Sequence, residues 1–462
     1  MRRGWGRWLP AVLVMSCVAH AAAANDLLRL YRLAENHDAT LQAALAQRDA
    51  AIEAKPQALA LWLPQVSANA SAERERLGEQ LIAPQTVAST TITGCQIAAG
   101  AATQVCFGNG HGYGLNLSQT LWSFQSFSQL REASAQAAAA EANLLAAQQS
   151  LILRVAQAYF GVLSAHDALI TFQGARQSYG VLLNQARGRQ QTGVGPRADS
   201  DQAQAYYDAT AQSVIDSQNA LDDAELLLSE VTGAPATMVA ALRDTIPLES
   251  PDPASVDDWV SAALKDNPLV RSAQLQVDAA YHDIGVQRGK GLPSIAIAAG
   301  RSRDWGDLTI GGNSADDQIG VAVTWPLFQG GAVASQVRQS RALWKQAMAS
   351  YAGAQRDAER LTRSSYRGVV TGIARIAAAR RSFDSAGVSL EASKRSLEFS
   401  LGITGAEFNL LSTQNQYFNA QLLYSQTRYD YLTALLTLKQ QAGRLAEADL
   451  AAIDGLLVEK PP

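Results

Sequence analysis

The chain has 462 residues, of which 47% are hydrophobic and 17% are charged, and its formal net charge is −4. This composition is too apolar for an intrinsically disordered chain. Because no lysine- or arginine-rich run is present that would neutralise several phosphates, we expect no nucleic-acid partner.

Residues 1–24 have the pattern of a secretory signal peptide. Three arginines among the first seven residues precede an apolar stretch, and small residues before Asn25 suit cleavage. The apolar stretch is about ten residues long, too short for a membrane-spanning helix, which needs about 20. Lipidation of Cys17 is the alternative, but the residues before it fit a lipobox poorly. We therefore expect cleavage and export.

The exported chain keeps two cysteines, Cys95 and Cys106, in a glycine-rich segment. An even pair, close in sequence and in an exported protein, predicts a local disulfide, with two free thiols as the alternative. The five histidines are scattered and show no metal-ligand spacing. The sequence thus predicts no metal, no cofactor and no enzymatic activity.

The chain contains an internal repeat. Residues 41–68 align with 270–297, where Asp-Ala-Ala and Leu-Pro recur 229 positions later, and residues 113–122 align with 319–328. The repeating unit is about 210 to 230 residues long, and the first copy carries about 23 extra residues, which we assign to a projecting loop around the cysteines.

Two long stretches without proline predict long helices, because helix interiors exclude proline. In each copy, two shorter helices have together about the length of one long helix. These lengths favour end-to-end stacking of the short helices beside the long one. The predicted helices span 26–60, 125–191, 198–232, 256–289, 332–401 and 406–442.

Between these helices, alternating apolar and polar residues predict four strands. A strand of about ten alternating residues is long enough to cross a membrane. Four strands cannot close a barrel in lipid, where open edges are not tolerated and bacterial barrels have at least eight strands. Several chains must pool their strands, and three chains give twelve. The strands begin near Pro64, Tyr113, Ile295 and Ile319.

This order of elements resembles the TolC family of outer-membrane efflux proteins over about residues 26–445. The best local matches are the Leu-Pro turns, VTWPLFQGG at 323–331 and the hairpin tips TGVGPRADSD and LGITGAEFNLLS. The resemblance implies a mostly helical fold with a membrane β-barrel. Its homotrimer would form a 12-stranded barrel in the outer membrane, continued by a 12-helix tunnel through the periplasm.

The resemblance also divides the chain. After the signal peptide, we expect a first structural repeat at 25–233, a connector at 234–255, a second repeat at 256–443 and a C-terminal tail at 444–462. By analogy with the family, the connector and the tail are equatorial segments that lie around the middle of the tunnel.

The resemblance places a periplasmic gate at the hairpin tips. Asp199 falls on the gate aspartate of the first hairpin, Phe399 on a gate tyrosine, and Asn409 and Ser412 on two constriction aspartates. Rings of carboxylates select and bind cations, so these neutral residues predict weak cation selectivity. Glu407 is the alternative acid, displaced by one inserted residue.

The expected function is that of an outer-membrane exit duct. Its partners would be outer-membrane lipid, a periplasmic adaptor and an inner-membrane ABC or RND pump, and the alternative is a periplasmic coiled-coil adaptor or tether. The sequence leaves the cargo open and leans toward type I protein secretion. Candidate docking residues at the tips, for which solvated helix ends are the other reading, are Arg187, Arg189, Gly193, Gly195, Arg197, Gly402 and Gly405.

Overall fold

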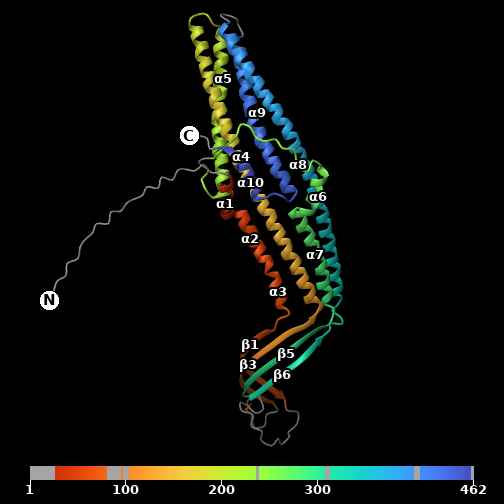
Figure 1. Cartoon of the computed structure of the whole chain (residues 1–462). Helices are drawn as coiled ribbons and strands as arrows, with labels where there is room; N and C mark the ends of the chain where they lie inside the picture. The colour runs from red at the N-terminus through yellow and green to blue at the C-terminus, as the bar shows by residue number, and fades with distance from the viewer. Residues whose placement is uncertain are drawn as a thin grey trace, which may run out of the picture.

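The structure is a computed structural model, and it shows a long, narrow molecule. A β-sheet occupies one end, two helical hairpins occupy the other, and shorter helices lie between them (Figure 1). The signal peptide and Cys17 lie outside the described residues. The structure describes residues 27–80, 95–96, 103–235, 239–306, 313–399 and 406–458.

The elements follow the predicted order. The helices are α1 (Leu27–His37), α2 (Ala39–Ile52), α3 (Ala54–Ala60), α4 (Phe124–Gln191), α5 (Arg197–Thr232), α6 (Val256–Asp266), α7 (Pro268–Gly289), α8 (Ala332–Phe399), α9 (Ala406–Gln441) and α10 (Glu447–Asp454). The strands are β1 (Gln65–Gln80), β2 (Cys95–Gln96), β3 (Thr103–Ser123), β4 (Ala241–Leu242), β5 (Ser294–Gly306), β6 (Asn313–Thr324) and β7 (Leu457–Val458).

The predicted long helices are present in the structure. Helices α4 and α8 have 68 residues each, which corresponds to about 100 Å of helix. In the half of the molecule away from the sheet, α5 packs on α4 and α9 packs on α8 (Figure 1). In the other half, α2 and α3 lie beside α4, and α7 lies between α4 and α8. The long helices therefore span both halves.

The prediction of one continuous short helix at 26–60 and at 256–289 is wrong. Each is interrupted, at Asp38 and at Asn267, by a residue that caps the next helix. The Asp38 carboxylate accepts a 2.6 Å hydrogen bond from a backbone N–H three residues on, and the Asn267 side chain accepts one of 2.9 Å two residues on. Such caps satisfy N–H groups at a helix start. The first segment breaks again at Glu53.

The two breaks are joints where short helices meet end to end. Helix α5 ends before Gly233, which lies beside His37, and α9 ends before Gly443, which lies beside Asp266. Both glycines have positive φ, 68° and 70°. A Cβ on Gly443 would lie 2.3 Å from the Asp266 carbonyl oxygen, so only glycine fits the conformation and the space. The stacking expected from the helix lengths is present in both copies.

The strands form one antiparallel sheet in the order β1-β3-β5-β6, with β2 beside β3. The β3–β5 pair joins the two copies. Strand β1 runs to Gln80 and β3 starts at Thr103, so part of the extra sequence in the first copy lengthens these strands. The prediction that all of it forms a loop is wrong in this respect.

The two faces of the sheet differ in polarity. Side chains of adjacent rows point to opposite faces. Near the helices, one row of cross-strand partners is apolar and the next is polar or small, so the sheet is amphipathic there. Further from the helices, the same face carries Arg301, Arg303 and Asp317, which form ion pairs. The apolar row is Val66, Leu117, Ala299 and Ile319, and the next row is Ser67, Asn116, Gly300 and Gln318.

The α-carbons of Cys95 and Cys106 are direct cross-strand partners in the β2–β3 pair. Their side chains lie outside the described part of the structure, so the disulfide remains a prediction. Among the helices that the structure describes, none combines the length and the apolarity needed to cross a membrane.

Candidate functional site

The α4–α5 hairpin ends in a tight turn that brings together the predicted docking residues. Gly193 has a φ of 76°, and the N–H groups of the next two residues both donate to the Arg189 carbonyl, at 3.0 and 3.1 Å. Arg197 is exposed and pairs with Asp201 at 3.4 Å, while Arg187 donates to Gln204. The tip therefore presents arginines to solvent, with the carboxylate of Asp201 beside Arg197. Gly402 and Gly405 lie outside the described residues.

The predicted gate residues of α9 share one face of the helix. Asn409 is exposed and Ser412 is half-buried, whereas Leu410 and Leu411 between them are buried in the core of the hairpins. The exposed face continues along α9 with residues that are mostly uncharged. These residues are Asn409, Gln416, Asn419, Leu423, Gln426 and Asp430.

Asp199 lies in the first turn of α5, at the same end of the molecule. Within the described part of the chain, its carboxylate makes no hydrogen bond or ion pair with Asn409, Ser412 or any other residue. The side chains of Phe399 and Glu407 lie outside what the structure describes. The roles assigned to these gate residues therefore remain predictions.

Sequence reasoning missed how the connector is attached. Residues 239–255, which we call the belt, lie along the helices at mid-length and are held by tyrosine hydroxyls. Tyr159 of α4 donates to the Ala240 carbonyl at 2.8 Å, and Tyr431 of α9 donates to the Glu249 carbonyl at 3.0 Å. The C-terminal tail pairs with the belt through β4 and β7. The two segments that the resemblance grouped are thus in contact.

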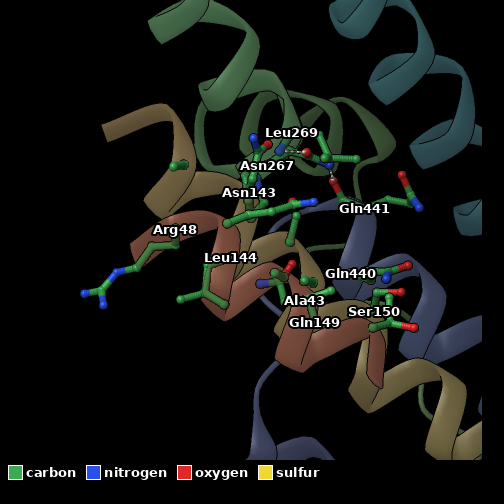
Figure 2. A pocket seen from close by; sticks show the side chains of 17 residues that line it. Ala43, Arg48, Asn143, Leu144, Gln149, Ser150, Asn267, Leu269, Gln440 and Gln441 are labelled. Atoms are coloured by element: carbon green, nitrogen blue, oxygen red, sulfur yellow. Dashed lines mark hydrogen bonds between the residues drawn. The ribbon is translucent and has the colours of Figure 1, made fainter. Parts of the chain in front are cut away.

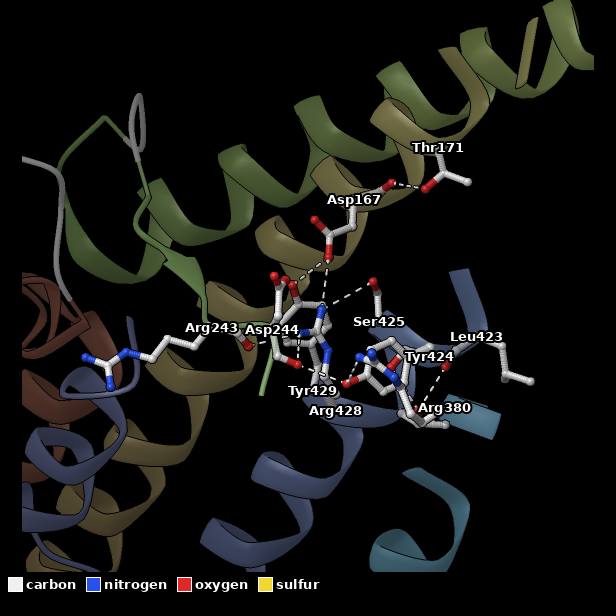
Figure 3. Close-up of polar contacts among 11 residues, drawn as sticks. Asp167, Thr171, Arg243, Asp244, Arg380, Leu423, Tyr424, Ser425, Arg428 and Tyr429 are labelled. Carbon is white, nitrogen blue, oxygen red and sulfur yellow. Dashed lines mark hydrogen bonds and ion pairs between the residues drawn. The ribbon is translucent and has the colours of Figure 1, made fainter. Parts of the chain in front are cut away.

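A buried polar cluster fastens the belt to α4 and α9 (Figure 3). Arg428 donates to the Arg243 and Asp244 carbonyls at 3.0 and 3.3 Å, and its guanidinium lies 4.0 Å from the Asp167 carboxylate. Tyr429 donates to the same carboxylate at 2.7 Å. Burial, together with the Asp167 charge, raises the pKa of Tyr429, so the hydroxyl stays protonated and remains a donor.

A cavity of about 560 Å³ lies at the second joint, between α2, α4, α7 and the end of α9 (Figure 2). Its polar groups are mainly amides: Asn267 donates to the Gln441 carbonyl at 2.8 Å, and Gln149 donates to the Gly443 carbonyl at 3.1 Å. Its one charged lining residue, Arg48, pairs with Asp49. Among the residues described, no cluster of three His, Cys, Asp or Glu side chains is placed to hold a metal.

In the hairpin half, α4 and α9 contact each other, α5 packs on α4 and α8 packs on α9, so α5 and α8 form the two sides, and their charges are opposite. Helix α5 has eight carboxylates and one arginine, while residues 364–399, the part of α8 in the hairpin half, have six basic and three acidic residues. The exposed faces follow a seven-residue spacing, which on α8 includes Ala374, and both contain an uncovered apolar side chain, Ile215 at 62% and Val388 at 72% exposure. The face of α5 carries Asp201, Asp208, Ile215 and Asp222, and the face of α8 carries Arg367, Arg381, Val388 and Arg395.

Comparisons with known proteins agree with this architecture. A family model described as outer membrane efflux protein matches residues 30–234 and 259–444. The chain is 29% identical to outer membrane protein TolC of Vibrio cholerae, covering 96% of this chain and 97% of that one. It is 27% identical to alkaline protease secretion protein AprF of Pseudomonas aeruginosa, covering 73% and 71%.

Among solved structures, the CmeC outer membrane channel of Campylobacter jejuni superimposes with a TM-score of 0.76 at 18% identity. The match covers 94% of this chain and 90% of that one, which establishes a common fold. With its repeated pattern of helices and strands and a family match over both copies, the chain belongs to the outer membrane efflux protein family.

Proposed function

We propose that three copies of this chain form an exit channel in the outer membrane. The channel extends into the periplasm and receives its cargo from an inner-membrane ABC or RND pump through an adaptor protein. The repeats at 25–233 and 256–443 build its wall, and the segments at 234–255 and 444–462 surround its middle. Twelve strands and twelve helices then enclose one water path.

The sheet supports closure by several copies. Strands β1 and β6 form its two edges within the described chain, and lipid does not tolerate unpaired backbone groups at such edges. One face of the sheet is apolar near the helices, where the β6 side chains of Ile319, Val321 and Val323 are at least 64% exposed, and the same face carries Arg301, Arg303 and Asp317 further from the helices. Pairing β6 of one copy with β1 of the next satisfies the edges and leaves the apolar part of this face for lipid.

The observation that carries the proposal is the opposite charge of the two sides of the helical wall. In a ring, α5 of one copy meets α8 of the next, with the two helices running antiparallel. Carboxylates on the α5 face then meet arginines on the α8 face, and the uncovered Ile215 and Val388 become buried. A head-to-tail contact that closes on itself gives a ring.

The hairpin ends fit the entrance of such a channel. The uncharged face of α9 around Asn409 and Ser412 lines the narrow end, so we expect weak cation selectivity there. The arginines near Gly193 offer the adaptor a positively charged surface. Two relatives bear on the cargo: one is named an alkaline protease secretion protein and another a proteases secretion protein. We therefore propose that a secreted protein is among the cargo.

Reconstitution tests the proposal. The purified protein should be a heat-resistant trimer in detergent and should produce discrete conductance steps in planar bilayers. Release of the protein by osmotic shock as a soluble monomer without conductance would contradict the channel and favour a tether.

A further inference from the structure

A second cavity, of about 400 Å³, lies where the helices meet the sheet. Its walls come from the start of α4, the end of α7 and the start of α8, which lie side by side next to the strands (Figure 1). Two glycines of α7 allow the helices to approach closely: a Cβ on Gly285 would lie 2.6 Å from the Ser128 hydroxyl oxygen, and one on Gly289 would lie 2.5 Å from the Gln125 backbone. The walls are therefore held together by direct helix contact.

The lining of this cavity is cationic and contains no carboxylate. Arg131, Arg288, Arg341 and Lys345 all line it, and within the described part of the chain none of them has an ion-pair partner within 4.0 Å. These four cations converge from three helices in a chain whose formal net charge is −4. The arrangement suits an anionic group, because opposite charges within a partly enclosed site attract more strongly than in water.

The same cavity also has aromatic walls. Phe127 and Trp344 line it, together with Phe124 and Tyr281, and Phe127 is 44% exposed. The Arg131 guanidinium lies over the Phe127 ring at 4.3 Å, which fixes its orientation. Aromatic and basic side chains together are typical of the membrane–water interface.

Acidic groups on these helices lie outside the cavity. Asp283 is about 200° around α7 from Tyr281, and it accepts a hydrogen bond from Ser340 of α8. It interacts electrostatically with Glu132 of α4. Neither carboxylate is part of the cavity lining. The basic side chains of these helices therefore line the cavity while these acidic ones lie outside it, so the cavity side suits an anion.

We propose that this cavity binds the headgroup of an anionic phospholipid from the inner leaflet of the outer membrane. The cations hold the phosphate, and the aromatic rings pack against the glycerol and the first acyl carbons. The inference rests on the proposed function, which places the sheet in the membrane and this junction at its periplasmic surface.

Native mass spectrometry of the assembled wild-type protein, titrated with phosphatidylglycerol or with zwitterionic phosphatidylethanolamine, tests the proposal. We expect preferential retention of phosphatidylglycerol. Arg288→Gln combined with Arg341→Gln should weaken its binding roughly thirtyfold, because each basic residue lost removes about 1 kcal/mol of attraction to an anionic lipid. The matched control is Arg271→Gln with Arg375→Gln, which removes one exposed arginine from each of the same two helices away from the cavity.

Equal retention of the two lipids, or equal loss in the cavity variant and the control, would overturn the proposal. The double variant Phe127→Ala with Trp344→Ala distinguishes a phospholipid from free phosphate as the ligand. Removing the rings should weaken phosphatidylglycerol but leave inorganic phosphate unaffected. If phosphate binds and the ring variant retains phosphatidylglycerol as well as the wild type does, the lipid assignment is overturned.

Planar-bilayer conductance separates this inference from the proposed function. The arginine variant should still form pores of wild-type conductance and ion preference. Normal pores together with unselective lipid retention would refute the proposed lipid site alone, whereas absence of pores in the wild type would refute the proposed channel function. A changed ion preference in the variant would place the cavity on the water path and overturn the lipid assignment.

Discussion

Reversing the charge on one side of the helical wall should prevent ring assembly. The variant carries Asp201→Lys, Asp208→Lys and Asp222→Lys on the exposed face of α5. Its α5 and its α8 are then both positive, so every contact between neighbouring copies becomes repulsive. All three carboxylates are exposed and lie outside the core of the single chain, so the fold of each copy should be retained.

The magnitude follows from the number of pairs. An exposed ion pair contributes about 0.2 to 1 kcal/mol. With Ile215 opposite Val388, the antiparallel register gives two pairs at each contact, Asp208 with Arg395 and Asp222 with Arg381. Two pairs at each contact and three contacts in the ring give about 1 to 6 kcal/mol, and replacing attraction by repulsion roughly doubles the difference. Salt screens such charges over about 10 Å at 0.1 M, so the defect should be largest at low ionic strength.

Native electrophoresis of membrane extracts measures the assembled fraction. We expect mostly monomer for the α5 variant, and recovery of the ring when the same chain also carries glutamates in place of Arg367, Arg381 and Arg395. Co-expressing the two single-side variants should rescue only partly, because three is odd and one contact in every mixed ring stays repulsive. Undiminished assembly of the α5 variant, at low salt, would refute the reasoning.

Three further variants test other parts of the account. Asp38→Ala removes a helix cap and the carboxylate that Arg154 contacts at 2.7 and 2.8 Å, and it should lower the free energy of unfolding by about 2 to 4 kcal/mol. Because Arg154 lowers the pKa of Asp38, the thermal midpoints of variant and wild type should converge as the pH falls through that lowered pKa. A difference that does not depend on pH would contradict the ion pair. Burial raises the pKa of Glu132, so its charged form is unfavourable at neutral pH; Glu132→Gln should raise the thermal midpoint at pH 7.5, with a gain that vanishes in acid, and a lowered midpoint would count against it. Asn409→Asp with Ser412→Asp should raise cation selectivity and create divalent block in planar bilayers, and unchanged reversal potentials would show that these residues do not face the pore.

The lengths of the long helices could be predicted from the sequence because proline marks their limits. Helix α4 begins one residue before its predicted start and ends at the predicted Gln191. The strands could be predicted because alternation has a period of two and each copy repeats it. The breaks at Asp38 and Asn267 also had local signals, a capping residue in each case and a following proline in the second. They were missed because the apolar pattern continues across them.

The belt contacts could not be predicted in the same way. Asp167 and Tyr429 are 262 residues apart and meet only after α4 and α9 pack together. The one local hint was Arg428, the lone basic residue of α9 before Lys439, in a stretch that packs into the core. A buried arginine needs several acceptors, but its partners include backbone carbonyls, which carry no sequence signal.

The central claim is that the functional unit is a closed ring of three identical copies around one water path. Its most direct test is the mass of the protein particle in the fraction that conducts ions in planar bilayers, determined by native mass spectrometry. The account predicts a mass of three mature chains. A conducting particle of one or two chains would contradict it.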